Sequence, residues 1–343
     1  MPEFEIDLDI KKAWTLPSKF YTDEGYFELS KDRIFAKCWH FLGRVNGQEA
    51  LYPAVILPGF LDEPILLSRS NGTLNCLSNV CTHRGKILVE KPCEANLIRC
   101  EYHGRRFSLD GKFLSMPEFD EAENFPSLSD DLHRYTVADS AGYNFVSGDP
   151  AAPFNEFVGE ARHSVLRIRG EDLQLKETKT YDVAAHWALY CENYLEGFHI
   201  PFVHKGLNDV VDYGTYRTET FRYSSLQTGY DQNGEIVGQY LFIFPNIMLN
   251  FYAWGLSVNI VEPVTPARSR IRYLIYVSDE SKFGAGAGGD LHRVELEDEA
   301  VVESVQQGIR SRYYDRGRYS PTREQGTHHF HRLIAEFMGC IAV

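Results

Sequence analysis

Two short segments of the sequence each combine a cysteine with a histidine. Cys81 and His83 form the first pair, and Cys100 and His103 form the second, with sixteen residues between His83 and Cys100. A glycine follows each histidine closely, so both pairs are expected in tight loops. Two thiolates and two neutral imidazoles can hold a [2Fe–2S] cluster, with the thiolates on one iron and the imidazoles on the other. The sequence therefore predicts an electron-transfer cluster.

A zinc site is the alternative for these four residues. Zinc sites with two cysteines and two histidines usually pair Cys with Cys and His with His, whereas each segment here supplies one of each. The cluster is therefore favoured. Its imidazoles raise the reduction potential by about 0.25 V or more over an all-thiolate cluster, which suits it to accept electrons from a flavin or ferredoxin.

A second group of metal-binding side chains follows later in the chain. We predict a helix over Asp182–Phe198, and helical spacing of 100° per residue brings Glu196 and His199 to one face. Pro201 then ends the helix, so that His204 turns back toward the same point. Two imidazoles and one carboxylate bind Fe(II) and leave positions open for O2. The carboxylate must come from a distant part of the chain.

The elements around these groups indicate two β-containing modules joined near residue 150. Residues 1–36 have helical periodicity, and short apolar runs separated by Gly, Pro and Asn-Gly over 39–146 are typical of a small all-β domain. Later runs such as 240–254 are rich in aromatic and branched residues, as strands are. The pattern becomes helical again from residue 295, and we expect His328, His329 and His331 on the solvated face of the terminal helix.

The segments CTHRG (81–85) and CEYHG (100–104) resemble the two cluster loops of Rieske-type non-haem iron oxygenases. In the commonest form of these loops a Pro follows the second Cys and a Trp follows the second His-Gly. Glu101 and Arg105 stand at those positions here. Neither is a ligand, so the departure concerns the surroundings of the cluster and not its assembly.

The segment ENYLEGFHIPFVH (192–204) resembles the second motif of the same family, in which Asn and an acidic residue precede two histidines. The resemblance implies that His199 and His204 bind the iron. It places Asn193 and Glu196 at the positions of the family's Asn and bridging acid. That acid links an iron-ligand histidine to a cluster-ligand histidine, here His103, across a subunit boundary.

The family's third iron ligand is an Asp near the start of a long helix. The matching position is Asp298, with Glu295 and Glu297 as neighbouring alternatives. The bridging acid is Asp in most members, and Glu at this position resembles the choline, carnitine and glycine betaine branch. The segment 244–254 resembles the wall of the substrate chamber. Its aromatic residues form either core or a cage for an alkylammonium, together with Tyr190, Phe198 and Phe202.

The resemblance implies an α+β fold with two domains. Residues 37–150 are expected to form an all-β Rieske domain, and residues 151–343 a catalytic domain whose antiparallel sheet is flanked by helices, of the helix-grip type. Residues 1–36 are expected to pack on the catalytic domain. The family's head-to-tail trimer implies a homotrimer here.

The implied activity is the oxygenase component of a multi-component enzyme. A separate NAD(P)H-dependent reductase or a ferredoxin would supply electrons, and O2 would hydroxylate or N-demethylate a small substrate, for which we favour a quaternary or tertiary ammonium compound. Hydroxylation of an aromatic ring by a mono- or dioxygenase is the first alternative. A non-catalytic Rieske electron carrier and a zinc-stabilised binding module are alternatives of other classes.

Composition agrees with these expectations. The formal net charge is −13, without a basic block, which argues against nucleic-acid partners and weakly against anionic membranes. No apolar run reaches membrane-spanning length, and the first residues lack the pattern of a signal peptide. Seven cysteines are an odd number for a disulfide framework. We therefore expect a cytoplasmic protein.

Overall fold

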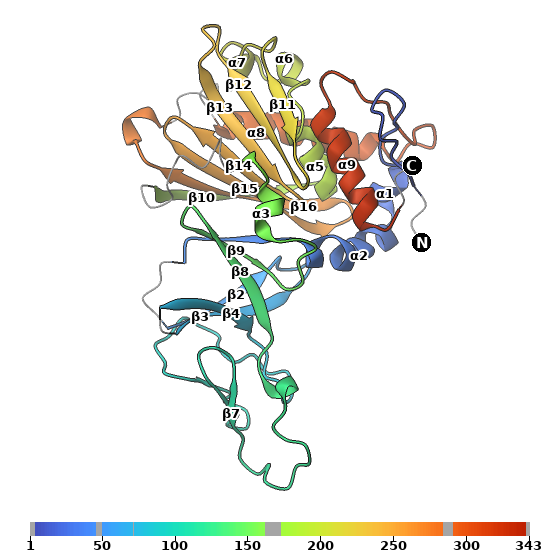
Figure 1. Cartoon of the computed structure of the whole chain (residues 1–343). Coiled ribbons are helices and arrows are strands. Elements are labelled where there is room, and N and C mark those ends of the chain that lie inside the picture. Colours follow the sequence, from blue (N-terminus) through green and yellow to red (C-terminus); the bar gives the residue numbers. More distant parts are fainter. Residues whose placement is uncertain (1–3, 46–49, 71, 162–172, 284–290, 341–343) are drawn as a thin grey trace. The chain divides into compact units, whose positions relative to one another are not determined.

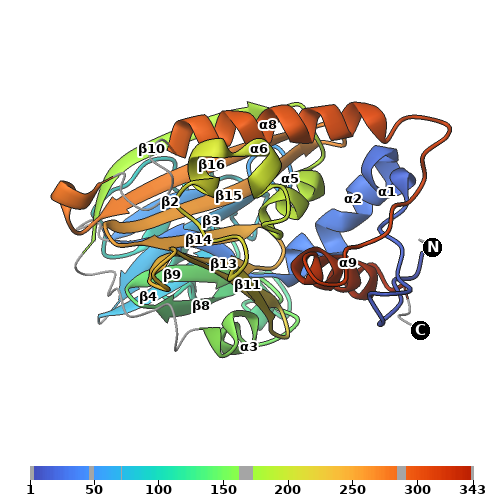
Figure 2. The same cartoon turned by 90° about the horizontal axis from the view of Figure 1, so that it is seen from above.

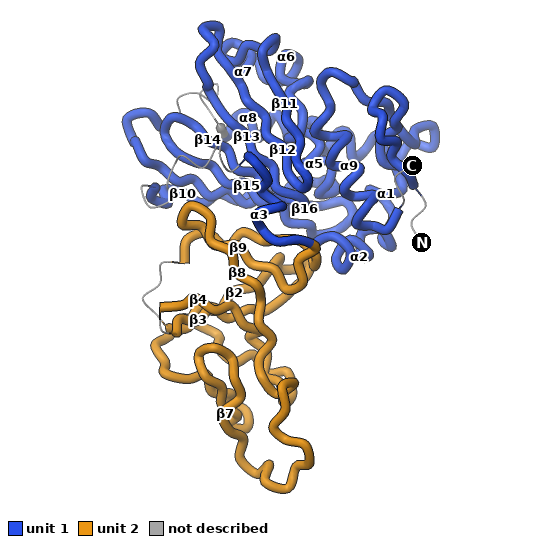
Figure 3. Tube along the Cα trace, viewed as in Figure 1, with its two compact units in different colours: residues 1–35, 152–343 blue, residues 36–151 orange. Residues whose placement is uncertain are grey.

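The computed structural model describes residues 4–45, 50–70, 72–161, 173–283 and 291–340. The chain divides into two compact units, shown in different colours in Figure 3. Residues 36–151 form one unit, and residues 1–35 and 152–343 form the other. Among the described residues, no helix is long and apolar enough to cross a membrane.

The regular secondary structure described for the unit of residues 36–151 consists of antiparallel strands and two short helices. A six-stranded sheet has the order β1-β9-β8-β4-β3-β2, and a three-stranded sheet has the order β5-β6-β7. The strands are β1 His40–Gly43, β2 Leu51–Ile56, β3 Glu63–Ser70, β4 Thr73–Ser78, β5 Ile98–Arg99, β6 Arg106–Phe107, β7 Phe113–Ser115, β8 Arg134–Ser140 and β9 Tyr143–Ser147. Two short helices accompany them, η1 (Phe35–Lys37) at the start of the unit and η2 (Leu128–Asp130).

The larger unit is built on a seven-stranded antiparallel sheet of order β10-β16-β15-β14-β13-β12-β11 (Figure 1). Its strands are β10 Gln174–Val183, β11 Arg217–Thr220, β12 Ser224–Tyr230, β13 Ile236–Ile243, β14 Ile247–Tyr252, β15 Gly255–Thr265 and β16 Arg268–Val277. Its helices are α1 Ser18–Thr22, α2 Glu24–Arg33, α3 Phe154–Val158, α5 Trp187–Tyr194, α6 Ile200–Val203, α7 Lys205–Asn208, η4 Glu280–Lys282, α8 Leu291–Gly308 and α9 Gln325–Phe337.

Helix α5 lies at the centre of the helical layer. It contacts β15 and β16 of the sheet and also contacts α8 and α9. Figure 2 shows the long helix α8 running beside the sheet, with α5 and α6 near it. The N-terminal segment reaches this layer through Phe20 and Phe27, whose rings contact His186 just before α5. The expected α+β fold, with an antiparallel sheet flanked by helices, is confirmed.

The helix predicted over Asp182–Phe198 is shorter than expected. Asp182 and Val183 belong to β10 and pair with Arg270 and Ser269 of β16, so sheet pairing takes the residues that local pattern assigned to the helix. Helix α5 begins only after His186, whose Nδ1 accepts from the amide of Ala188 (3.3 Å). It ends at Tyr194.

Pro201 therefore does not stop the helix that carries Glu196, as the sequence suggested. It lies in the first turn of the new short helix α6, where its missing N–H costs no hydrogen bond. His199 is the residue before that helix, and His204 is the residue after it. The two histidines are thus held at the two ends of one short helix.

The expectation that His328, His329 and His331 lie on a solvated face is wrong. His331 is 0% exposed and His328 is 6% exposed, and His329 is partly buried. Helix α9 is amphipathic, and this face packs inward, where the Nε2 of His331 lies 3.1 Å from Glu192 and the hydroxyl of Tyr319 is 2.5 Å from its Nδ1. Burial lowers the pKa of His329 to about 4.

Candidate metal centres and substrate cavity

The two Cys/His segments form loops with the same backbone hydrogen bonds. In each loop the amide of the cysteine donates to the carbonyl five residues later (2.8 Å), and the amide four residues later donates back to the cysteine carbonyl (3.0 Å). That fourth residue is Gly85 in one loop and Gly104 in the other, with φ of 69° and 75°. This left-handed conformation favours glycine, which explains the glycine in both segments.

The thiols of these loops point inward and the histidines lie toward the surface. Cys81 is 3% exposed and Cys100 is 2% exposed, and both belong to an apolar cluster with Leu77, Leu88 and Phe107, among others. Burial raises the pKa of the Cys81 thiol. The two imidazoles are partly exposed, with ring centroids 4.8 Å apart. The two matching loops thus supply two buried thiols and two imidazoles near solvent.

The donor set of these loops fits a two-iron cluster. The two thiols are buried and the two imidazoles are partly exposed, so the thiolates can share one iron and the imidazoles the other. The Nδ1 of His103 is also buried without a hydrogen-bond partner in the described part of the chain, as an atom available to a metal would be.

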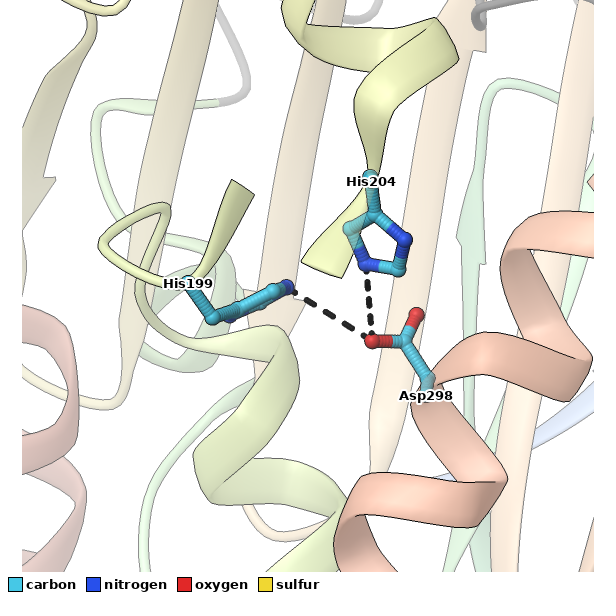
Figure 4. Close-up of side chains that lie close together, drawn as sticks. All are labelled: His199, His204 and Asp298. Carbon is cyan, nitrogen blue, oxygen red and sulfur yellow. Dashed lines mark hydrogen bonds and ion pairs between the residues drawn. The ribbon is translucent and has the colours of Figure 1, made fainter. Parts of the chain in front are cut away.

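The donor atoms of His199, His204 and Asp298 lie within 4.8 Å of one another. Figure 4 shows both imidazoles turned toward the carboxylate of Asp298, which projects from α8. The Nε2 of His204 is 3.0 Å from the Oδ1 of Asp298, and the Nε2 of His199 is 3.6 Å from the same oxygen. Two imidazoles and one carboxylate are the donor set of an open Fe(II) site.

A further carboxylate holds each of these imidazoles on its other side. The Oε1 of Glu196 lies 2.7 Å from the Nδ1 of His199, and the Oε2 of Glu297 lies 2.8 Å from the Nδ1 of His204. Burial disfavours the charged form of His204, but the carboxylates of Asp298 and Glu297 outweigh this and raise its pKa. The site therefore leaves both Nε2 atoms for a metal and surrounds them with negative charge.

Asn193 also belongs to this centre. Its Nδ2 donates to the Oδ1 of Asp298 (2.7 Å), so the side chain fixes the carboxylate between the two histidines. Of the three acidic side chains that the sequence left open as the third ligand, only Asp298 lies in the group with both histidines. Glu297 contacts His204 from behind, and Glu295 contacts Tyr190 and Tyr273.

A cavity of about 130 Å³ adjoins the three donors. Its floor is one face of the sheet, where Gln227, Tyr240, Asn250 and Ser257 are successive partners on β12, β13, β14 and β15. Polar residues at these strand positions are buried, with Gln227 at 1% and Asn250 at 4% exposure. The described residues that line it are Tyr190, Asn193, Tyr194, Glu196, His199, Ile200, His204, Leu207, Val211, Tyr216, Gln227, Tyr240, Asn250, Tyr252, Ser257, Asn259, Tyr273, Val294, Glu295 and Asp298.

For the 244–254 segment and the aromatic residues grouped with it, the sequence left core packing and a substrate cage as alternatives, and only some of these residues line the cavity. Asn250, Tyr252 and Tyr190 line it. Phe198 and Phe202 do not, and they are 40% and 78% exposed.

Sequence reasoning did not assign the remaining tyrosines of the cavity, or the roles of Glu295 and Glu297. Burial raises the pKa of Glu295 to about 8, although the hydroxyls of Tyr190 and Tyr273 donate to it. The sequence does contain a signal for the polar floor of the cavity. Asn250 and Asn259 interrupt otherwise apolar strands, and a buried polar residue needs a partner or a ligand.

Comparison with known proteins matches both units to described families. The Rieske [2Fe-2S] domain family matches residues 57–126, and the family of the ring hydroxylating alpha subunit (catalytic domain) matches residues 211–340. The oxygenase subunit of carnitine monooxygenase from Escherichia coli (strain K12) is 31% identical over 359 residues, which cover 95% of this chain and 94% of that protein. The chloroplastic choline monooxygenase of Arabidopsis thaliana is 29% identical, over 97% of this chain and 85% of that protein.

A solved structure has the same fold over nearly the whole chain. The crystal structure of a quaternary ammonium Rieske monooxygenase in complex with its substrate L-carnitine superimposes with a TM-score of 0.78 at 26% identity, covering 98% of this chain and 100% of that one. Such oxygenase subunits work with a separate reductase, O2 and a small substrate. With two cluster loops and an open iron triad in the expected units, the chain belongs to the Rieske non-haem iron oxygenases, as an oxygenase subunit with a [2Fe–2S] cluster and a mononuclear iron.

Proposed function

We propose that this protein oxidises a quaternary or tertiary ammonium compound, by hydroxylation or N-demethylation. The observation that carries the proposal is the open triad of His199, His204 and Asp298 beside a cavity lined by six tyrosines. Aromatic faces attract alkylammonium groups. The relatives named for choline and carnitine, which span most of the chain, support the same substrate class.

The roles of the metal-binding residues follow from their positions. Cys81, His83, Cys100 and His103 would hold the cluster, and the triad would hold the iron, which supplies O2 activation when electrons arrive. In this proposal unit 36–151 is the Rieske domain, residues 152–343 are the catalytic domain, and residues 1–35 pack on the latter.

The residues around the iron triad would act by holding it in place. Asn193 fixes the carboxylate of Asp298 through the 2.7 Å hydrogen bond. Glu196 accepts from His199 Nδ1 (2.7 Å), which keeps Nε2 turned toward the metal position.

Glu196 has a second proposed role in linking the two metal centres. Its Oε2 accepts from the amide of His199 (3.1 Å), so the carboxylate is held from two sides. His103, with Nδ1 given to the cluster, has Nε2 left to donate to a carboxylate. We propose that Glu196 of one subunit receives this hydrogen bond from His103 of the next, within a homotrimer, and thereby connects the cluster of one subunit to the iron of its neighbour.

The external partners complete the proposal. An NAD(P)H-dependent reductase or a ferredoxin would deliver electrons to the partly exposed histidine side of the cluster loops. None of the seven cysteines forms a disulfide with another, which supports the proposal of a reducing, cytoplasmic compartment.

The direct test is O2 uptake by the iron- and sulfide-reconstituted protein with a surrogate reductase. Choline, L-carnitine and glycine betaine should each be compared with monocyclic aromatic compounds, and products should be identified by mass spectrometry. We expect O2-dependent product from at least one ammonium compound and from none of the aromatic ones. The variant Asp298→Ala should keep the cluster's absorbance, bind two irons in place of three, and form no product. Turnover of aromatic rings alone would contradict the proposed substrate class.

A further inference from the structure

Glu295 is a buried carboxylate in the wall of the substrate cavity, at 3% exposure. Its Oε2 accepts hydrogen bonds from the hydroxyls of Tyr190 (2.6 Å) and Tyr273. Its Oε1 has no hydrogen-bond partner among the described residues, although the carboxyl group of Glu299 lies close, one helical turn further on. Without a cationic partner the buried carboxyl group of Glu295 favours its neutral form, and burial raises its pKa to about 8. A cationic ligand beside it would favour the charged carboxylate.

The rest of the cavity lining offers no such cation. The described lining residues include three carboxylates, Glu196, Glu295 and Asp298, but no lysine and no arginine. Glu196 contacts His199, and Asp298 faces both histidines of the metal triad. Glu295 is therefore the carboxylate of the lining that neither a proposed iron ligand nor a basic side chain engages.

The charge balance of the loaded site points the same way. Fe(II) with the carboxylate of Asp298 and two neutral imidazoles carries a net charge of about +1. The carboxylates of Glu196 and Glu297 behind the two imidazoles more than offset this charge, so the loaded site attracts a cation, and Glu295 adds a further negative group in the wall of the cavity. A substrate carboxylate would find no positive side chain in the described lining, and binding it to the iron would use positions that O2 needs.

The other polar groups of the cavity are neutral. Asn250, Asn259, Gln227 and Ser257 line the sheet floor and offer amide and hydroxyl groups. Such groups suit a hydroxyl, which both donates and accepts, better than an unpaired carboxylate. The aromatic rings of Tyr190 and Tyr273 stand beside Glu295 and can contact methyl groups on a cationic nitrogen.

We propose, building on the proposed function, that Glu295 is the counter-ion of the substrate's ammonium group, and that the substrate is an alkylammonium cation without a carboxylate, of the amino-alcohol type. Choline represents this class. L-carnitine and glycine betaine, which are zwitterions, do not belong to it.

The test measures equilibrium binding by calorimetry under anaerobic conditions, so that no turnover is needed. The ligands are choline, its neutral carbon isostere 3,3-dimethylbutan-1-ol, glycine betaine and L-carnitine. The wild-type protein should bind choline about tenfold or more tightly than each of the other three, as a cation in an aromatic and acidic site requires. In Glu295→Gln the affinity for choline should fall toward that for the isostere, while the affinity for the isostere stays unchanged.

Two control variants separate charge from packing. Glu303→Gln makes the same change on the same helix but outside the cavity lining, and its amide oxygen can still accept from the amide of Ala184. Glu303→Gln should still bind choline in preference to the other three ligands. Glu295→Asp retains the negative charge and should recover part of the preference that Glu295→Gln loses. Should Glu295→Gln not fold, the four wild-type affinities decide the question alone.

The outcomes distinguish this inference from the proposed function. Equal or tighter binding of the zwitterions, or an unchanged preference for choline in Glu295→Gln, overturns the assignment of Glu295 while O2-dependent oxidation of an ammonium compound still stands. Absence of product from every ammonium compound removes the proposed function itself. Iron and sulfide contents are measured on each variant, so that loss of a metal is not mistaken for loss of a counter-ion.

Discussion

Single carboxylates lie behind the two histidines that we propose as iron ligands and hold their imidazoles in one orientation. Glu297 is the clearest case, because its Oε2 contacts His204 Nδ1 (2.8 Å) while its Oε1 accepts from Arg293 (3.1 Å). The hydrogen bond from His204 is the main reason that the pKa of Glu297 is lowered. The side chain is thus a charged, fixed acceptor that keeps the imidazole ring in one orientation.

We predict that Glu297→Gln weakens iron binding by about 10- to 100-fold, the usual effect of removing an acceptor behind a metal-ligand histidine. The amide can no longer offer a charged acceptor to Nδ1, so Nε2 becomes a poorer donor to the metal. Titration of the iron-free protein with Fe(II), with the cluster absorbance as an internal standard, measures the change. Glu303→Gln on the same helix should bind iron as the wild type does. Unchanged affinity in Glu297→Gln would remove Glu297 from the metal centre.

At the residue scale, the sequence predicted groupings of residues that lie close together along the chain. Cys81 and His83 are two positions apart, and the fold keeps them in one loop. His204 and Glu297 are brought together by the packing of α8, and no local pattern reveals that contact. Arg105 shows the same limit. It is 2% exposed and pairs with Asp130, and its guanidinium lies over the ring of Phe113 (4.9 Å).

Elements of the larger unit meet at His186, between β10 and α5. The ring is 1% exposed, it caps α5, and the aromatic side chains of the N-terminal helices pack on it. Burial lowers the pKa of His186 to about 3. In the unfolded chain the same imidazole has a pKa near 6.5. As the pH falls, the unfolded state therefore takes up a proton before the folded state does. The stability that neutral His186 contributes is complete above about pH 6.5 and is lost progressively as the pH falls toward 3.

We predict that His186→Asn makes the protein less sensitive to acid. Asn can still cap α5 but does not titrate. Between pH 7.5 and 5.5 the variant should lose about 1 kcal/mol less unfolding free energy than the wild type, from the proton that unfolded His186 would bind. Urea unfolding followed by tryptophan fluorescence at both pH values measures the difference. His292→Asn, at an exposed position of α8, is the control, and an identical loss in all three proteins would contradict the assignment.

At the element scale, secondary-structure type was easier to predict than secondary-structure bounds. Aromatic and branched residues in 240–254 predicted strands, and β13 and β14 are there. The start of α5 was wrong because Asp182 and Val183 pair with a strand almost ninety residues later. The helical pattern of α9 indicated a helix, but which face is buried depends on Tyr319 and Glu192, which come from other parts of the chain.

For the whole molecule, the proposed homotrimer requires that electrons pass between subunits. Each cluster would then serve the iron of a neighbour through Glu196, and the two metal centres of one chain would not need to work together. Two variants test this, because each is designed to remove one of the two metal centres. Cys100→Ser removes a proposed cluster ligand and leaves the proposed iron triad, whereas Asp298→Ala removes a proposed iron ligand and leaves the cluster loops.

Each variant alone should form no product. When the two are mixed and allowed to exchange subunits, a cluster-bearing chain lies next to an iron-bearing chain at a fraction of the interfaces, and about a quarter of wild-type activity should return in a head-to-tail ring. Product formation after mixing, compared with unmixed samples of the same metal content, measures this. If transfer occurred within one chain, the mixture would stay inactive, because no chain has both centres. Mass photometry before and after exchange shows whether the active species is a trimer, and recovery of activity in monomers alone would remove the head-to-tail arrangement from the proposal.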